Sequence, residues 1–319
     1  MERNLFFDFC KGLLIFFVVL GHVLAYYSPE KTNHVLFLWI SSFHMPCFFF
    51  ISGIFAVSSL SNGYKDCLLK KTRRLLLPSF VWTFLSFLLF VILGEYTSPD
   101  IRDFYMEMRK HWFLFALFAF FVIAKLFFLC NKPYIYYFLI MVTFIATYNI
   151  IPIDILKHFH VVDYWPSFFA GIASSQFSGG GIISNKHFST IVKLLCLSLL
   201  IYVLWTIGML TDYDRWRFSN QKYVLRMVVY LSSILVYLSL FQVLISFLEN
   251  KVVNIIIKVG RNTMVIYCTN EIFLRAIKVQ TSNIMLLLII SILITYSGYV
   301  LSLILRKNVC TCKYLLGEN

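Results

Sequence analysis

Two polar side chains in an otherwise apolar stretch, Lys11 and His22, have the types and the spacing to do chemistry. They lie eleven residues apart, so on a helix they share one face and stand about 16 Å apart along its axis. Asp8 precedes Lys11 by three residues on the same face, within reach of an ion pair. A neutral imidazole can accept a proton from an alcohol. The stretch predicts a cation toward one membrane side and a general base, His22, toward the other.

Charge inside a membrane span is costly, at about 2.5–3.5 kcal/mol per residue on insertion scales, so such residues are candidates for function. A histidine on an apolar helix is often a packed, hydrogen-bonded residue instead, and this alternative stays open for His22. The face that His22 shares with Lys11 favours the functional interpretation.

The chain that must position these residues has the composition of a membrane protein. Of its 319 residues 60% are hydrophobic and 13% are charged, about half of the ~25% charged residues of soluble proteins. Mean hydropathy is +0.80. The net charge of +13 is also compatible with nucleic-acid binding, but the basic residues lie in short segments between apolar runs, as the positive-inside rule predicts. We therefore expect an all-α, polytopic integral membrane protein, with residues 1–319 in a single domain.

Apolar runs long enough for about ten membrane helices recur along the chain. We expect helices at 5–27, 35–57, 75–94, 112–130, 134–151, 164–177, 189–210, 224–248, 255–277 and 284–305. The segment 58–74, taken as a loop, is strongly basic, which favours both termini in the cytoplasm. His22 then lies in the outer half of the first helix and Lys11 in the inner half.

Three further patterns exclude other kinds of site. The eight cysteines are scattered, and Cys310 and Cys312 lack zinc-site spacing, so we expect neither a disulfide framework nor a metal. The first apolar run contains charged residues and no small-residue cleavage site, so it should be retained rather than cleaved as a signal peptide. The glycine run 178–181 is a flexible connection and lacks the ending of a phosphate-binding loop.

The second expected helix contains a proline at position 46. Pro46 lacks a backbone donor, which loosens the preceding turn and frees carbonyls around Ser42. His44 lies beside this irregularity, where it either bonds a freed carbonyl and fixes the kink or lines a reaction cavity. Ser52, about two helical turns beyond His44, is another candidate for such a lining.

A basic cluster, Lys70-Lys71-Thr-Arg73-Arg74, precedes the third expected helix. It can set topology and contact anionic lipid heads, at about 1 kcal/mol per basic residue. It can also be a cytoplasmic docking site for a phosphorylated donor, because Arg and Lys complement phosphate. Both interpretations stay open.

The later helices carry a second set of polar candidates. Trp112 opens a helix on the outer side, where tryptophan is usually an interface anchor. Asn270 and Glu271 lie in the interrupted run 255–277, with Glu271 at about the depth of His22. Its carboxylate either orients or stabilises the imidazole, or forms an internal ion pair with Arg275.

These blocks resemble the membrane acyltransferase-3 family, which includes bacterial O-acetyltransferases of cell-surface polysaccharides. The similar segments cover nearly all the expected helices in order. They are Lys11-x10-His22 after Asp8, Phe43-His44-Met45-Pro46 through Ser52-Gly53, Lys71-x-x-Arg74-Leu-Leu-Leu-Pro78, Trp112-Phe113-Leu114, Gly171, and Val259-Gly260 through Tyr267.

The resemblance implies an acyl-CoA donor, acetyl-CoA by preference, on the cytoplasmic side of a bacterial cytoplasmic (inner) membrane. It implies transfer of the acyl group to a sugar hydroxyl of a surface glycan or of its lipid-linked precursor. The family's Arg-x10-His pair corresponds to Lys11 and His22, and its Arg-x-x-Arg to Lys71 and Arg74. Many relatives carry a histidine after the last block, where this chain has Thr269-Asn270.

The expected site therefore has three groups of residues. The catalytic residues are His22 and Glu271. The donor-binding residues are Lys11, Lys71, Arg73 and Arg74. The residues that line or support the cavity are Asp8, His44, Ser52, Trp112 and Asn270.

Three other functions remain as alternatives. A glycan or lipid transporter (flippase) would also carry buried charges in a broken helix, although no pair of interrupted segments recurs in corresponding halves. A glycan polymerase or ligase usually depends on large outer loops, and the longest one expected here, 95–111, is modest. A sensory or scaffolding membrane protein needs no aligned Lys11 and His22.

Overall fold

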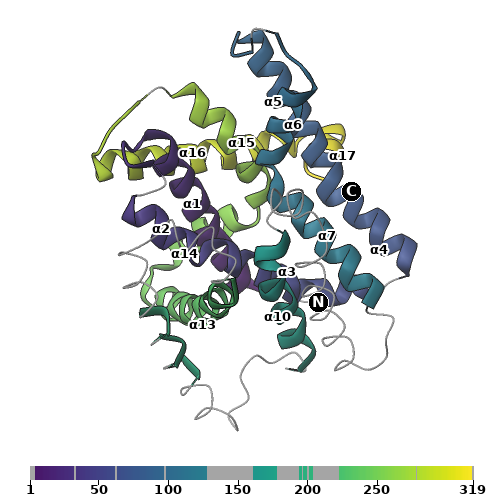
Figure 1. Ribbon diagram of the computed structural model, residues 1–319, viewed down its shortest axis with the longest axis vertical. Helices are drawn as coiled ribbons and strands as arrows, with labels where there is room; N and C mark the ends of the chain where they lie inside the picture. Colours follow the sequence, from purple (N-terminus) through teal and green to yellow (C-terminus); the bar gives the residue numbers. More distant parts are fainter. Residues whose placement is uncertain are drawn as a thin grey trace. The chain divides into compact units, whose positions relative to one another are not determined.

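The described chain is helical throughout its regular elements (Figure 1). The computed structural model describes residues 4–31, 34–61, 63–96, 98–127, 161–177, 194–195, 197–199, 201–203, 223–277 and 279–317. The helix expected at 134–151, most of the one expected at 189–210 and the glycine run 178–181 lie outside these residues. The chain divides into two compact units, and each is described by itself. Unit 1 comprises Met1–Ile54 and Pro166–Ile304, and unit 2 comprises Phe55–Trp165 and Leu305–Asn319.

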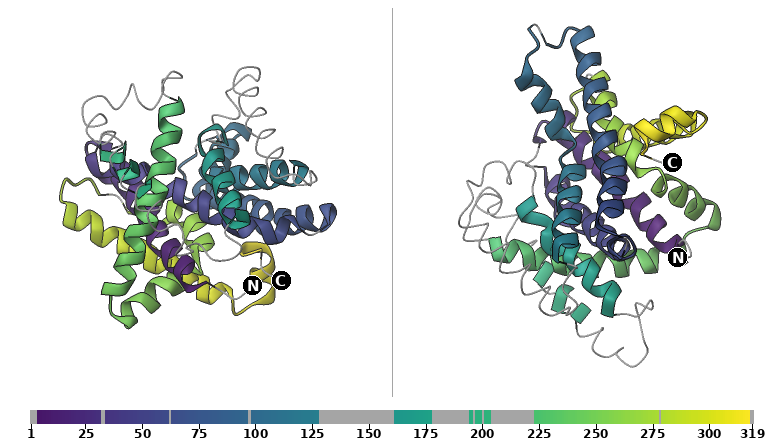
Figure 2. Two further views of the ribbon diagram at one scale, coloured as in Figure 1. Left: turned by 90° about the horizontal axis from the view of Figure 1, so that it is seen from below. Right: turned by 90° about the vertical axis from the view of Figure 1, so that its right-hand side faces the viewer.

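Unit 1 is built around the first helix. Its elements are α1 (Leu5–Tyr27), α2 (Val35–Ser41), the first part of α3 (His44–Leu60), most of α10 (Val161–Phe177), α13 (Tyr223–Phe247), α14 (Asn250–Gly260), α15 (Thr263–Ala276) and α16 (Ile284–Leu305). The bounds of α1 and α16 are those expected from the sequence, and α13 is one unbroken rod (Figure 2).

Helix α1 packs against α14 with the two backbones in contact. A Cβ atom added at Gly12 would meet the carbonyl oxygen of Ile256, and one added at Gly260 would meet the carbonyl oxygen of Asp8. Small residues at a membrane-helix crossing permit this close approach. At the start of α1, the Asn4 side chain accepts a hydrogen bond from the Phe6 backbone N–H at 3.0 Å and caps the helix.

The second expected helix is divided into α2 and α3, with Ser42 and Phe43 between them. Pro46 has no N–H to offer the carbonyl of Ser42, so the loosened turn predicted there is confirmed. The ring of Phe43 stacks on Tyr237 of α13, with centroids 3.7 Å apart. The Ser42 hydroxyl lies 2.7 Å from the Tyr202 hydroxyl. These contacts hold the break in a defined conformation.

The interrupted run near the C-terminal third is also two helices. Helix α14 ends at Gly260 and α15 begins at Thr263, with Arg261 and Asn262 between them. The polar residues in this run therefore mark a break in the helix. It is the second break in unit 1 that falls at a position with polar side chains.

Unit 2 contains the basic segment and the C-terminal helix. Its elements are α4 (Tyr64–Lys71), the π-helical turn η2 (Thr72–Leu76), α5 (Leu77–Ile92), α6 (Ile101–Lys110), α7 (Trp112–Phe127) and α17 (Val309–Leu315). The expectation of a loop over 58–74 is wrong from Tyr64 onward, where the chain is helical and continues directly into α5. Lys and Arg have a high helix propensity, so a run of basic residues does not by itself indicate a loop.

Five stretches among the described residues are long and apolar enough to cross a membrane, namely Leu5–Tyr27, Val35–Leu60, Tyr64–Ile92, Met227–Phe247 and Ile284–Leu305. Large apolar side chains on these helices stay exposed, among them Ile92 at 72% and Phe247 at 83%. A contiguous apolar surface is unfavourable in water and favourable against lipid. The chain is a multi-pass membrane protein.

Candidate active site

Asp8 forms the centre of a charged cluster between α1 and α14. Its carboxylate is 4% exposed and accepts from the Lys11 ammonium at 2.7 Å through Oδ1. Through Oδ2 it accepts from Nε of Arg261 at 3.2 Å. The ion pair predicted for Asp8 and Lys11 is present, whereas Arg261 was not foreseen. Two cationic side chains of the described residues therefore contact this one carboxylate, and they are 27% and 33% exposed.

His22 lies eleven residues beyond Lys11 on the same face of the unbroken helix α1. Its ring is half-buried, and within the described residues no hydrogen bond holds it. The packed, hydrogen-bonded alternative is therefore not supported by the described part of the chain. The Glu271 carboxylate is close enough to interact electrostatically with the imidazole.

Glu271 is held by two neighbours. The phenol of Tyr26 donates a hydrogen bond to Oε1 of Glu271, and Nε of Arg275 lies 3.4 Å from the same oxygen. Both interpretations of Glu271 have support, because the carboxylate forms the internal ion pair and also acts on His22. The role of Tyr26 was not predicted. Tyr26 follows His22 by four residues, so the spacing alone places the two side chains on the same face of α1.

The end of α1 is fixed against the end of α15. The Tyr27 hydroxyl donates to the Leu274 carbonyl, and the backbone N–H of Thr281 donates to the Tyr27 carbonyl at 2.9 Å. These bonds anchor the C-terminal end of α1 to α15 and to the segment that follows it.

His44 is oriented by the helix break. Its Nδ1 lies 2.6 Å from the carbonyl oxygen of Ile40. Because a carbonyl can only accept, Nδ1 carries the proton, and Nε2 of the neutral ring has the lone pair. The ring is half-buried, and His44 and His22 are close enough to interact electrostatically. The bond to a carbonyl near the kink was one of the two expectations for His44, and it leaves the cavity-lining role open.

The remaining unit 1 candidates have less distinctive surroundings. The side-chain amide of Asn270 donates to the Tyr267 carbonyl of its own helix at 2.7 Å. Ser52 is half-buried and precedes Gly53, where an added Cβ would meet the carbonyl oxygen of Phe168. Ser52 thus lies at a tight crossing of α3 and α10.

Three of the four donor-binding candidates, Lys71, Arg73 and Arg74, lie in unit 2, on and beside the π-helical turn. The Lys71 ammonium lies 3.7 Å from the ring centroid of Phe121 on α7, a cation–π contact. Arg73 and Arg74 are exposed on η2. Pro78 follows four residues after Arg74 and can give it no N–H, which accounts for a widened turn at this position.

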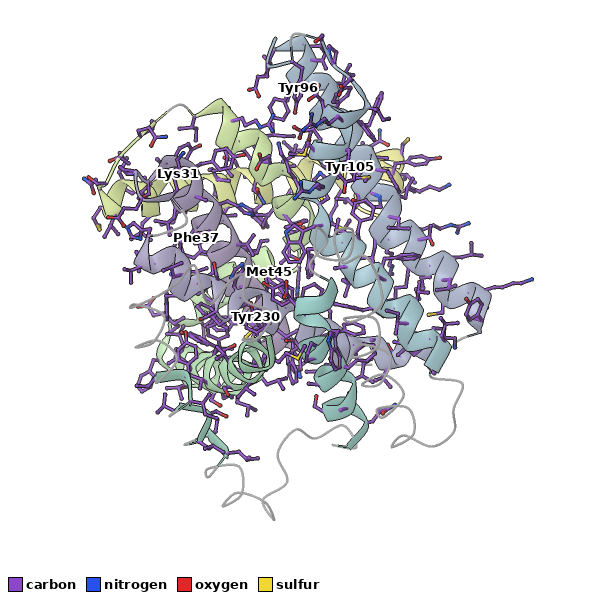
Figure 3. All side chains as sticks on the ribbon, viewed as in Figure 1. Lys31, Phe37, Met45, Tyr96, Tyr105 and Tyr230 are labelled. Atoms are coloured by element: carbon purple, nitrogen blue, oxygen red, sulfur yellow. The ribbon has the colours of Figure 1, made fainter. Side chains whose placement is uncertain are left out.

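A second polar cluster in unit 2 surrounds Glu107, which is 1% exposed. Lys110 donates to its carboxylate at 2.9 Å, and so does the phenol of Tyr96, which lies at the connection between α5 and α6 (Figure 3). Burial lowers the pKa of the neighbouring His111 to about 4, against the opposing charge of Glu107. This cluster was not predicted.

Trp112, the expected interface anchor, stacks on Tyr164 with ring centroids 5.6 Å apart.

The chain was compared with known proteins. The model of the acyltransferase-3 family, described as "Acyltransferase domain", matches residues 4–306. The chain belongs to the acyltransferase-3 family. Two curated relatives share part of it, and both are named "Nodulation protein NolL". The one from Sinorhizobium fredii is 33% identical over 139 residues, which is 40% of this chain and 37% of the relative. The one from Mesorhizobium japonicum is 30% identical over 138 residues, 39% of this chain and 36% of the relative.

The chain therefore spans less than two fifths of the length of these relatives. No solved structure matches it. The acyltransferase-3 family match covers all the candidate site residues of both units, from Asp8 to Glu271.

Proposed function

We propose that the protein is a membrane-embedded O-acyltransferase. It moves an acyl group, acetyl by preference, from acyl-CoA in the cytoplasm to a sugar hydroxyl of a cell-surface glycan or of its lipid-linked precursor. The membrane is the bacterial cytoplasmic membrane, crossed about ten times by a single domain with both termini in the cytoplasm. The acyltransferase-3 family match supports the reaction class.

In this mechanism His22 is the general base. Its imidazole takes the proton of the acceptor hydroxyl while the hydroxyl oxygen attacks the thioester carbonyl carbon. A C–O bond forms, the C–S bond breaks, and the departing thiolate takes the proton back from the imidazolium. Glu271, charged and held by Tyr26 and Arg275, stabilises that imidazolium.

The donor is bound through its phosphates. Lys71, Arg73 and Arg74 supply the cations in unit 2, and Arg matches phosphate oxygens in a bidentate way. Lys11 is the remaining donor-binding residue of the proposal, and within unit 1 its ammonium pairs with Asp8, as the Arg261 guanidinium does.

One observation carries the proposal, which is the half-buried imidazole of His22 beside an anchored carboxylate. An imidazole that no described hydrogen bond ties and that lies within electrostatic reach of a carboxylate is available for proton transfer. A histidine with a purely structural role on an apolar helix would have its ring nitrogens hydrogen-bonded to neighbouring groups.

The test is acyl transfer by the purified protein in lipid nanodiscs, with radiolabelled acetyl-CoA and glycan extracted from the source membrane. Wild type should label the glycan, and mass spectrometry should find the increment of one acetyl group. His22→Ala should abolish the labelling and leave the protein folded. Full activity of His22→Ala would disprove the assignment of the base. Movement of unmodified glycan across the bilayer would show a transporter instead, and longer glycan without acetyl would show a polymerase.

A further inference from the structure

The C-terminal helix α17 packs on α5, and α5 continues directly from η2, the turn that carries the proposed donor-binding arginines. The indole N–H of Trp82 on α5 donates to the carbonyl oxygen of Leu315, the last residue of α17, at 3.1 Å. Leu316 is 6% exposed, and Gly317 is buried as well. Residues 316 and 317, which follow α17, are therefore packed against the rest of unit 2.

Gly317 touches the backbone of the π-helical turn. Its φ of 62° lies in the left-handed region, and a Cβ added to it would lie 2.6 Å from the carbonyl oxygen of Arg73 and 2.7 Å from Cα of Arg74. The same atom would lie 3.1 Å from Cγ of Pro78. A non-glycine residue here must displace backbone, because no flexible side chain is available to yield.

The turn that Gly317 contacts needs support from outside. It is a π-helical turn whose Arg74 carbonyl lacks an N–H from Pro78, while Arg73 and Arg74 are exposed. The direction of both side chains follows from the backbone beneath them, and Gly317 lies against that backbone. Helix α17 begins at Val309, beyond the family match that ends at residue 306.

We propose that the C-terminal segment 309–317 is a positioning element of the donor-phosphate site. By holding η2 in its π-helical form, it fixes Arg73 and Arg74 in the directions that bind the phosphates of acyl-CoA. This inference rests on the proposed function, and it assigns to a segment outside the family match a role in donor affinity.

The experiment compares two alanine substitutions of glycines that share the left-handed conformation within unit 2. Gly94 has φ of 75° and nothing within 4 Å of an added Cβ, so Gly94→Ala reproduces the conformational strain without the collision. Gly317→Ala adds the collision with Arg73 and Arg74. A stop codon after Asn308 removes the segment altogether, and Trp82→Phe removes only its hydrogen bond.

The readout is KM and kcat with two donors, acyl-CoA and acyl-pantetheine, which lacks the phosphates. Gly317→Ala and the truncation should raise KM for acyl-CoA about tenfold, the equivalent of one lost charge-assisted hydrogen bond, and leave kcat nearly unchanged. KM for acyl-pantetheine should not change, and Gly94→Ala should behave as wild type. Trp82→Phe should show a smaller rise in KM for acyl-CoA.

The outcomes separate the inference from the function it rests on. If Arg73→Ala and Arg74→Ala raise KM for acyl-CoA but Gly317→Ala and the truncation do not, the positioning role is wrong and the donor site stands. If Gly317→Ala impairs both donors equally, the segment has a general structural role and the inference is overturned. If wild type transfers no acyl group from either donor, the proposed function itself fails.

Discussion

Tyr26 and Glu271 are joined by a hydrogen bond from phenol to carboxylate, one helical turn beyond His22 on α1. The bond ties the N-terminal helix to α15, which lies about 245 residues later in the chain. It uses the same oxygen that Arg275 approaches. The carboxylate that acts on His22 is thereby held by side chains of both helices. Its role can be tested by substituting either Glu271 itself or Tyr26.

Glu271→Gln should lower kcat about tenfold or more, because the charge that stabilises the imidazolium is lost while the amide keeps the shape. Tyr26→Phe should lower kcat by a smaller factor. Tyr27→Phe is the matched control. It should cost about 1 kcal/mol of stability, because the Leu274 carbonyl loses its donor, and it should leave kcat of the folded protein unchanged. Equal kcat for the Tyr26 and Tyr27 variants would contradict the role of Glu271.

His44→Asn separates the structural from the chemical role of His44. The asparagine amide replaces the Nδ1–H donor to the Ile40 carbonyl but supplies no basic nitrogen. We expect thermal stability near wild type and a kcat about tenfold lower, because the imidazole that lies near His22 and lines the proposed cavity is replaced. His34→Asn is the control, since asparagine also caps α2 in place of the His34 ring. Wild-type kcat in His44→Asn would leave only the structural role.

Asp8→Asn should destabilise the protein by about 2 kcal/mol or more, because it leaves Lys11 and Arg261 facing each other without the buried anion. Lys11→Arg should preserve both the ion pair and donor binding. Lys11→Met should raise KM for acyl-CoA with little loss of stability. Thermal unfolding in detergent and KM measured in nanodiscs check the two effects separately, and an unchanged KM in Lys11→Met would remove Lys11 from the donor site.

His111 predicts a pH dependence of stability. Burial lowers its pKa in the folded protein to about 4, from an ordinary value of 6.5, and outweighs the nearby Glu107 charge, which acts to raise it. The unfolded chain therefore binds an additional proton between these values, so the stability due to neutral His111 is complete above pH 6.5 and is lost as the pH falls toward 4.

The check is the unfolding temperature between pH 7 and pH 4 for wild type and His111→Gln. The variant should lose less stability over this interval than wild type does, even if it is less stable at pH 7. Parallel curves for the two proteins would show that His111 does not titrate as inferred.

Local features of the fold were predictable from the sequence where local physics decides them. The bounds of α1, the ion pair of Asp8 with Lys11 and the break before Pro46 follow from apolar run length, helical spacing and a missing N–H. The helical form of α4 was missed, because a dense run of charge was taken to mean a loop. The segment is helical because its basic residues favour a helix and because the helix continues into α5.

The partners that complete the site could not be predicted, because they come from remote parts of the chain. Arg261 reaches Asp8 across 253 residues, and Tyr26 reaches Glu271 across 245. No periodicity connects such positions. The orientation of His44 depends on which carbonyl the break releases, and the contact of Gly317 with Arg73 depends on how the last helix packs.

The glycines at the crossing of α1 and α14 have a mechanical consequence. With backbone against backbone at Gly12 and Gly260, α1 cannot rotate about its own axis without driving a carbonyl into its neighbour. Lys11 and His22 therefore keep fixed directions relative to α14, and in the proposed reaction we expect any movement that admits substrate to come from other helices.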